Sequence, residues 1–211
     1  MVTRFVFFDL GNVLIRFSLE RLLKQVSEVF QVSPDEIAGF YLNNFRIQKD
    51  FESGKIDTDA YYERICNHFG QKPLKIELFL AINDIFWPNE GMLPIVAGLR
   101  KIDFPCGILS NVGPLHWNHC RTTFPEIMEL IPNHHVLSFE VQALKPEREI
   151  YEAALEIAQK SVPDLAPGEI LFIDDLTQNV EAAREFGFDA VTFTGRDALK
   201  KVFIERDLPL F

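Results

Sequence analysis

Short apolar runs alternate with longer segments of helical periodicity along most of this chain. The first run, Phe5-Val6-Phe7-Phe8, ends at one carboxylate, Asp9, and a Gly-Asn pair follows at once. A short apolar run closed by a breaker is typical of a strand buried on both faces, as in a parallel sheet. Asp9 is therefore expected at the carboxyl end of that strand, where open α/β sheets bind their ligands. Taken alone, the same residue is equally well explained as a carboxylate that caps the strand before a turn.

The segment from residue 16 to residue 88 has a different pattern, with helical periodicity and almost no strand signal. Its first apolar stripe runs from residue 19 to residue 30, and Ser18 precedes it as an N-cap. Ser33-Pro34-Asp35-Glu36 combines an N-cap, a proline at the first helical position and a glutamate at the third, which together start a helix. Two further helices are predicted: from Asp57 or Thr58 to about His68, and from the break at Gln71-Lys72-Pro73 to about Phe86, with a turn at Phe51-Glu52-Ser53-Gly54-Lys55.

The second half of the chain alternates helices with short apolar strands. Strands are predicted at 107–110, 135–138, 169–173 and 190–193, and helices at 93–101, 115–124, 146–160 and 177–186. Such alternation indicates a βαβ series and a mostly parallel sheet. The predicted fold is therefore α/β, a doubly wound parallel sheet with helices on both faces and a helical domain inserted after strand one. The predicted domains are 1–15 with 89–211 for the α/β core and 16–88 for the insertion.

The composition narrows the class of protein. The 211 residues are 47% hydrophobic and 25% charged, as in a soluble globular domain. A formal net charge of −10 argues against general nucleic-acid binding and against attachment to anionic membranes. The three cysteines, Cys66, Cys106 and Cys120, have no metal-binding spacing. With no signal-peptide pattern and no apolar run long enough to span a membrane, we expect a cytoplasmic protein.

Three further strand ends carry polar residues suited to phosphate chemistry. Ser110-Asn111 offers a hydroxyl and an amide that can donate to phosphoryl oxygens. Lys145 precedes Pro146, a residue expected at the first position of a helix, so Lys145 is expected at a helix start where anions bind. Asp174-Asp175 follows a buried strand, and with Asp9 it forms the all-oxygen ligand set that Mg²⁺ prefers. Each pair alone also fits a turn or a cap, but four such strand ends in one chain are rarely met by chance.

Together these motifs resemble the haloacid dehalogenase superfamily of phosphotransferases, whose four motifs occur in this order. The matching stretches are Phe8-Asp9-Leu10-Gly11-Asn12-Val13-Leu14 for motif one, Leu109-Ser110-Asn111 for motif two, Lys145-Pro146 for motif three and Asp174-Asp175 for motif four. Asn179 matches a position that is often polar in that family, and the insertion resembles the small helical cap of its subfamily IA. The Asp-Leu-Gly-Asn-Val form of motif one is most similar to the α-D-glucose-1-phosphate phosphatase-like branch.

The resemblance implies a phosphoric monoester phosphatase that acts on a small phosphorylated metabolite, such as a sugar phosphate. Asp9 would attack phosphorus and form an aspartyl-phosphate, which water then hydrolyses. The implied Mg²⁺ ligands are Asp9, the carbonyl of Gly11, Asp175 and, in or near the coordination sphere, Asp174. The groups implied around the transferring phosphoryl group are Gly11, Asn12, Ser110, Asn111 and Lys145, with Ser110 and Lys145 also counted as catalytic. Oligomeric state is not specified by the sequence.

One position departs from the family's pattern. Phosphatases of this family usually carry a second aspartate two residues after the nucleophile, as general acid and base, and here that residue is Gly11. Losing a general acid typically costs about 10²–10⁴ in rate, or roughly 3–5 kcal/mol of barrier. The cost is smaller for leaving groups that need little protonation, so the sequence predicts better activity on aryl, acyl or anomeric phosphates than on simple alkyl phosphates.

Three interpretations stay open on the sequence alone. The first is the Mg²⁺-dependent phosphatase just described. The second is a catalytically weak member of the family that binds a phosphorylated ligand or a protein partner, which the glycine at position 11 favours. The third is a metal-independent dehalogenase-type hydrolase in which Asp9 forms an ester with carbon. The pair Asp174-Asp175 argues against this third interpretation, because such enzymes usually lack an adjacent acid pair in motif four.

Overall fold

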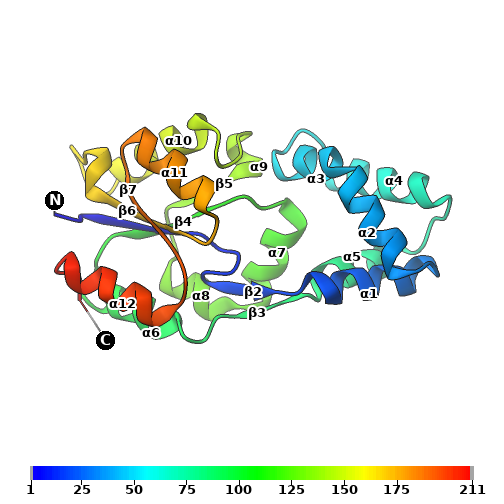
Figure 1. Cartoon of the computed structure of the whole chain (residues 1–211), viewed down its shortest axis with the longest axis horizontal. Coiled ribbons are helices and arrows are strands. Elements are labelled where there is room, and N and C mark those ends of the chain that lie inside the picture. Colours follow the sequence, from blue (N-terminus) through cyan, green and yellow to red (C-terminus); the bar gives the residue numbers. More distant parts are fainter. Residues whose placement is uncertain (1, 210–211) are drawn as a thin grey trace.

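A five-stranded parallel sheet forms the centre of the protein, which a computed structural model describes over residues 2–209. The strand order is β5-β4-β1-β6-β7, so the N-terminal strand lies in the middle (Figure 1). All four neighbouring pairs are parallel, which confirms the doubly wound α/β prediction. The strands are β1 Phe5–Phe8, β4 Cys106–Ser110, β5 His135–Leu137, β6 Ile170–Asp174 and β7 Asp189–Thr192.

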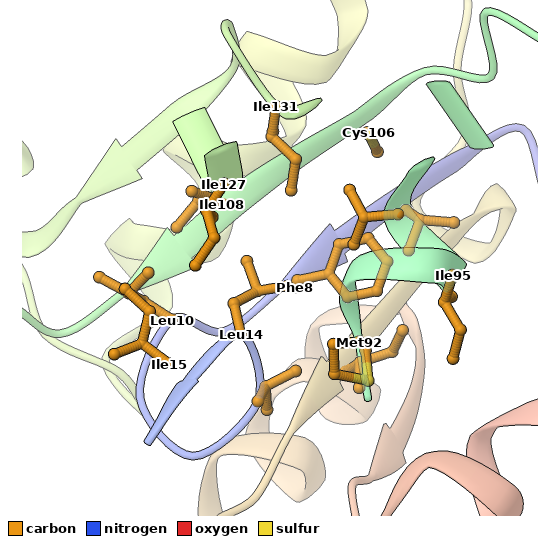
Figure 2. Packing of buried hydrophobic residues seen from close by; sticks show 14 of the residues in the cluster. Phe8, Leu10, Leu14, Ile15, Met92, Ile95, Cys106, Ile108, Ile127 and Ile131 are labelled. Carbon is orange, nitrogen blue, oxygen red and sulfur yellow. The ribbon is translucent and has the colours of Figure 1, made fainter. Parts of the chain in front are cut away.

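Alternate residues of β1 face two different layers of helices. Val6 and Phe8 belong to an apolar cluster with α6, α7, α8 and α12, whereas Phe5 and Phe7 belong to a cluster with α10 and α11. Figure 2 shows the first cluster, in which Phe8 packs among aliphatic residues of neighbouring elements. These helices are α6 Leu93–Lys101, α7 Pro114–Thr123, α8 Pro125–Leu130, α10 Arg148–Gln159, α11 Thr177–Phe186 and α12 Arg196–Glu205. Because both faces are covered, β1 is buried along its whole length, as its unbroken apolar run predicts.

Five helices of the insertion pack around an apolar cluster of their own, to the right of the sheet in Figure 1. They are α1 Leu19–Phe30, α2 Pro34–Asn43, α3 Phe45–Glu52, α4 Thr58–Phe69 and α5 Lys75–Asn83. The predicted starts are confirmed: Ser18 and Asp57 accept backbone N–H groups, and Ser33 forms a reciprocal capping box with Glu36. We call α1–α5 the helical cap; the boundary at residues 16 and 88 stays a prediction.

An antiparallel ribbon of two short strands joins the helical cap to the core. It pairs β2, Ile15–Phe17, with β3, Phe86–Pro88. The prediction of a nearly strand-free segment with a helix reaching Phe86 is therefore wrong, since α5 ends at Asn83. Strands of three residues show no period-two signal, and here each forms only because the other end of the insertion lies beside it.

Other predicted boundaries are corrected by the structure. Helix α10 begins at Arg148 rather than at Pro146, and the Lys145–Pro146 peptide bond is cis. Lys145 therefore does not lie at a helix start. Helix α3 includes Phe51 and Glu52, which the sequence placed in a turn. The elements that the sequence did not predict include the helices α8, α9 Ser138–Val141 and α12, and the 3₁₀ helix Pro167–Glu169.

Within residues 2–209, no helix combines the length and apolar character needed to cross a membrane. The three cysteines are buried free thiols.

Candidate active site

The carboxyl ends of β1, β4 and β6 meet around the ammonium group of Lys145. Lys145 Nζ lies 2.9 Å from Asp9 Oδ1 and 2.6 Å from Asp174 Oδ2, and it donates to the Leu109 carbonyl at 3.0 Å. Its side chain is 1% exposed and that of Asp174 is fully buried, so these charges are removed from water. The convergence follows from the parallel sheet, which brings successive strand ends to one edge.

Asp174 is held by donors on both of its oxygens. Its Oδ1 accepts from Leu176 N at 2.8 Å and from Asn179 Nδ2 at 3.0 Å, while its Oδ2 contacts Lys145 and again Asn179, at 3.1 Å. Three donor groups, Leu176 N, Asn179 Nδ2 and Lys145 Nζ, thus make four contacts with these two oxygens, out of about four lone-pair sites on a carboxylate. These contacts favour a role for Asp174 in holding Lys145 and Asn179, and they leave Asp175 better placed to bind a cation directly.

Asn12 connects the loop after β1 to the second carboxylate of the pair. Its Nδ2 donates to Asp175 Oδ2 at 2.9 Å, and its backbone φ of 56° lies in the left-handed region that asparagine tolerates better than most residues. The place of Asn12 near the phosphoryl group stays a prediction, and in the structure its side-chain amide orients Asp175, a predicted metal ligand.

Of the two polar residues at the end of β4, Ser110 lines the cavity and Asn111 binds the backbone of Lys145. Ser110 is buried, 2% exposed, and lines the cavity described below. The side-chain amide of Asn111 is bonded to the backbone of Lys145 in both directions: Nδ2 donates to the Lys145 carbonyl at 2.9 Å, and Oδ1 accepts from Lys145 N at 2.8 Å. This amide therefore fixes the loop that carries Lys145.

The charges of this site do not balance by themselves. One ammonium, that of Lys145, faces three carboxylates, and Asp9, Asp174 and Asp175 offer oxygens within 4.8 Å of one another. Burial, together with the neighbouring Asp174 and Asp175, raises the pKa of Asp9 to about 7 against the opposing effect of Lys145. Burial disfavours the charged form of Lys145, but Asp9 and Asp174 outweigh it and hold the pKa of Lys145 above its usual value.

This donor set fits a hard divalent cation. All of its ligand atoms are oxygens, the excess charge is negative, and a bound cation would favour the ionised carboxylate of Asp9. Gly11, whose carbonyl the sequence assigned as a ligand, lies two residues after Asp9 in the turn that leads to β2. The roles assigned to Asp9, Gly11, Asp174 and Asp175 as metal ligands stay predictions.

A cavity of about 290 Å³ lies between the helical cap and this edge of the sheet. Its core side includes Gly11, Ser110 and Asn111, and its cap side includes Tyr41, Gln48, Glu52 and Tyr61. Most of the remaining wall is apolar: Leu10, Ile15, Phe17, Leu19, Leu22, Ile82, Ile85, Phe86, Val112 and Cys120. The cavity gives a leaving group a place next to the predicted phosphate site.

Glu52 lines the cavity but was not identified as a site residue from the sequence. Nothing in its local pattern shows that the end of α3 lies against the core. The sequence places the aromatic residues of the cap in its interior, with one or two lining the substrate slot: Phe40, Tyr41, Phe45, Phe51 and Trp87. Phe40 and Phe51 are buried and Tyr41 lines the cavity, whereas Phe45 and Trp87 are exposed, at 69% and 44%.

The sequence offers two weaker candidates: His116 and His119, three residues apart on a predicted helix, as a metal-binding pair, and Arg16 as a contact to the cap or to a substrate phosphate. His116 lines the cavity, and its ring packs edge-on against Phe86 with centroids 5.0 Å apart. His119 packs on the same phenylalanine, and within residues 2–209 the two histidines belong to no metal-type cluster. Arg16 is an exposed residue of β2.

Comparison with known proteins identifies the family. A family model described as haloacid dehalogenase-like hydrolase matches residues 3–187. The chain belongs to this family of hydrolases. The motif assignments made from Asp9, Ser110, Lys145 and Asp174 agree with that membership.

Two curated proteins illustrate the range of similar sequences. D-ribitol-5-phosphate phosphatase from Bacteroides thetaiotaomicron is 23% identical over 87% of this chain and 88% of its own length. Bifunctional epoxide hydrolase 2 from Rattus norvegicus is 26% identical over 93% of this chain. The chain spans only 37% of that rat protein's length.

A solved structure resembles the whole arrangement. A haloacid dehalogenase family enzyme from Bacteroides thetaiotaomicron, in complex with magnesium and inorganic phosphate, superposes with a TM-score of 0.76 and 25% identity. The match covers 90% of this chain and 93% of that one. None of these three relatives singles out the α-D-glucose-1-phosphate phosphatase-like branch, which stays a prediction.

Proposed function

We propose that this hydrolase is a Mg²⁺-dependent phosphatase of small phosphorylated metabolites. The observation that carries the proposal is the buried cluster in which Asp9, at the end of β1, lies 2.9 Å from Lys145 and beside Asp174 and Asp175. A carboxylate nucleophile, one fixed ammonium and a set of oxygen ligands are the parts that phosphoryl transfer requires.

The residues of this chain have separate tasks in the proposed reaction. Asp9 attacks phosphorus, the bond from phosphorus to the leaving-group oxygen breaks, and water then hydrolyses the aspartyl-phosphate. Lys145, Ser110 and the Asn111 N–H stabilise the phosphoryl oxygens, while Asn111 and Asp174 hold Lys145 in place. When bound by Asp9, Asp175 and the Gly11 carbonyl, with Asp174 beside them, Mg²⁺ supplies charge neutralisation at the phosphoryl group.

The substrate class is proposed from the cavity and from relatives. A cavity of about 290 Å³ suits a small leaving group, and one similar curated protein is a phosphatase of a sugar-alcohol phosphate. We therefore propose phosphate monoesters of small metabolites, sugar phosphates among them, as substrates, and a cytoplasmic location as their natural setting. No nucleic-acid or membrane partner is proposed.

The test is phosphate release by the parent chain and by Asp9→Asn, each with Mg²⁺ and with EDTA. The substrates are p-nitrophenyl phosphate and glucose-1-phosphate. We expect turnover that needs Mg²⁺ and that Asp9→Asn abolishes, because the amide is a poor nucleophile and a weaker cation ligand. Turnover that survives either EDTA or Asp9→Asn would refute the proposal.

A second candidate is favoured by one observation, the glycine at position 11. Without a side chain there, the loop after β1 offers no proton donor, and the protein could instead bind a phosphorylated ligand without turning it over. A folded parent chain that binds Mg²⁺ but releases no phosphate from a broad panel of monoesters would support this alternative.

A further inference from the structure

A phosphate ester of an alcohol needs a proton on its leaving oxygen, and the loop after β1 does not supply one. Gly11 has no side chain, yet space is present: a Cβ built there would meet only the ring of Phe17, at 3.5 Å, which is ordinary contact. The backbone φ of Gly11 lies outside the left-handed region, so neither strain nor crowding requires a glycine. The absence of an acid at this position is therefore a feature of the chemistry and not of the packing.

The cavity contains another carboxyl group, contributed by the helical cap. Among its lining residues in the described chain, Glu52 at the end of α3 carries the sole carboxyl. It lines the same cavity as Gly11, Ser110 and Asn111, and it belongs to the cap side of that cavity. A leaving group that fills this cavity therefore contacts walls that carry both the predicted phosphate site and Glu52.

The backbone that carries Glu52 is fixed to the core. Ser138 Oγ, fully buried at the start of α9, donates to the Glu52 carbonyl at 2.6 Å and accepts from Val112 N at 2.9 Å. Gly54 lies so close to the core that a Cβ there would come within 2.2 Å of the Phe139 carbonyl oxygen. This end of the cap is thus held against the loop that follows β4, and the position of Glu52 is set by the core.

The side chain of Glu52 is also oriented. Gln48 Nε2 donates to Glu52 Oε1 at 2.6 Å, and Gln48 Oε1 in turn accepts from Tyr61 Oη at 2.8 Å. This chain of hydrogen bonds occupies one carboxyl oxygen and leaves Oε2 to carry a proton. The Tyr61 hydroxyl thus contacts the carbonyl end of the Gln48 amide, and the N–H₂ end of that amide contacts Glu52.

We propose that Glu52 is the general acid of this enzyme and protonates the leaving oxygen. The inference rests on the proposed function. As Asp9 forms its bond to phosphorus and the phosphorus–oxygen bond to the leaving group breaks, the proton of Glu52 passes to that oxygen and an alcohol departs. Glu52, now a carboxylate, then takes one proton from the water whose oxygen attacks the aspartyl-phosphate. Inorganic phosphate leaves, Asp9 is regenerated as a carboxylate, and Glu52 regains its proton.

The electrostatics of the cavity agree with this role. Burial raises the pKa of Glu52 to about 7, against the Gln48 hydrogen bond and the charge of Lys145, so both protonation states are accessible near neutral pH. The tyrosines and the histidine of the cavity are poorer acids: burial raises the pKa of Tyr41 to about 12 and holds that of Tyr61 well above its usual value, and it lowers the pKa of His116 to about 4, which leaves that ring neutral.

The proposal reverses one expectation drawn from the sequence. The glycine at position 11 predicted weak activity on alkyl phosphates, whereas an acid supplied by the cap makes alcohols acceptable leaving groups. The parent chain is therefore expected to cleave benzyl phosphate, an alkyl ester with an apolar body that suits the cavity wall. A parent chain that cleaves p-nitrophenyl phosphate but not benzyl phosphate would overturn the proposal.

The decisive variant is Glu52→Gln, which keeps the shape of the side chain and removes its proton. First-turnover rates are measured by rapid quench with two substrates of similar size. For benzyl phosphate we expect the first-turnover rate to fall by about 10²–10⁴. For p-nitrophenyl phosphate, whose leaving group needs no proton, we expect little change in the first turnover. Slow hydrolysis of the aspartyl-phosphate should then produce a burst of p-nitrophenolate.

Two further variants separate chemistry from structure. Asp50→Asn removes a carboxylate from the same helix, one that pairs with Arg64 at 3.1 Å and does not line the cavity, and it should leave both first-turnover rates unchanged. Gly11→Asp in the Glu52→Gln background supplies an acid from the loop after β1 and should restore much of the rate with benzyl phosphate.

Each outcome of this set has a distinct meaning. Equal losses with both substrates after Glu52→Gln would assign Glu52 to structure or binding and overturn the inference, and so would no loss with either. If instead the parent chain shows no turnover that depends on Asp9 with any substrate, the proposed function fails first and the inference falls with it.

Discussion

The hydroxyl of Ser138 joins three parts of the molecule, and its removal should be costly. Ser138 is fully buried, and its Oγ bridges Val112 N in the loop after β4 and the carbonyl of Glu52 in the helical cap, at 2.9 and 2.6 Å. In Ser138→Ala the N–H of Val112, itself 5% exposed, is left without a partner. A buried unsatisfied group costs about 1–3 kcal/mol. Adding the lost bond to Glu52, we expect destabilisation by about 2–3 kcal/mol.

The assay is urea unfolding followed by far-UV circular dichroism, with a thermal scan in parallel. For a chain of this length, 1 kcal/mol corresponds to about 2–4 °C in Tm, so Tm should fall by about 5–10 °C. Ser27→Ala is the matched control. Ser27 is also buried, 6% exposed, but its hydroxyl donates only to the Lys24 carbonyl inside α1, so its loss orphans no group and should change stability by less than about 0.5 kcal/mol. Equal, small effects in the two variants would refute the reasoning.

Two further predictions concern stability. Burial lowers the pKa of His116 from 6.5 to about 4. Between these two pH values the folded chain binds fewer protons than the unfolded chain, so the free energy of unfolding decreases as the pH falls from 6.5 to about 4. Between pH 7 and 4.5 the parent should lose about 2 kcal/mol more than His116→Phe in urea unfolding; identical pH profiles would contradict this. The Cβ that Gly39→Ala adds in α2 has only Asn43 Nδ2 nearby, at 4.0 Å, which is an ordinary contact. Because alanine favours a helix over glycine, this substitution should raise the free energy of unfolding by about 0.5–1 kcal/mol. Gly54→Ala, with a φ of 68° and a collision with the core, should lower stability in the same thermal scans, and the opposite order would count against the described packing.

The helix starts and stops of this chain could be predicted because each depends on residues that are close together in the sequence. The capping box of Ser33 and Glu36 and the helix stop at Gly187, whose φ is 119°, need only residues within one turn. The candidate site followed from one further rule, that parallel strands end at a common edge. Asp9, Ser110 and Asp174 therefore converge although long stretches of chain separate them.

Predictions failed where a contact between distant segments decided the structure. Pro146 fits a helix start by local rules, but the loop around Lys145 is held by Asn111 and the helix begins two residues later. The ribbon of β2 and β3 has the same origin, since Ile15 and Pro88 pair across the whole insertion. Neither segment carries enough periodicity to outweigh such a contact, and local propensity is a weak guide there.

The sequence by itself determined the class of fold, the edge of the sheet that carries the candidate site, and the missing side chain at Gly11. Each of these depends on residue type and on the order of elements along the chain alone. The tertiary structure decided which carboxyl group shares the cavity with Gly11. Glu52 reaches the cavity because Ser138, 86 residues further along, binds its carbonyl, and because Gln48 turns its carboxyl group. The energy of such contacts comes from burial and hydrogen bonding between segments that meet only after folding, so no local pattern records them.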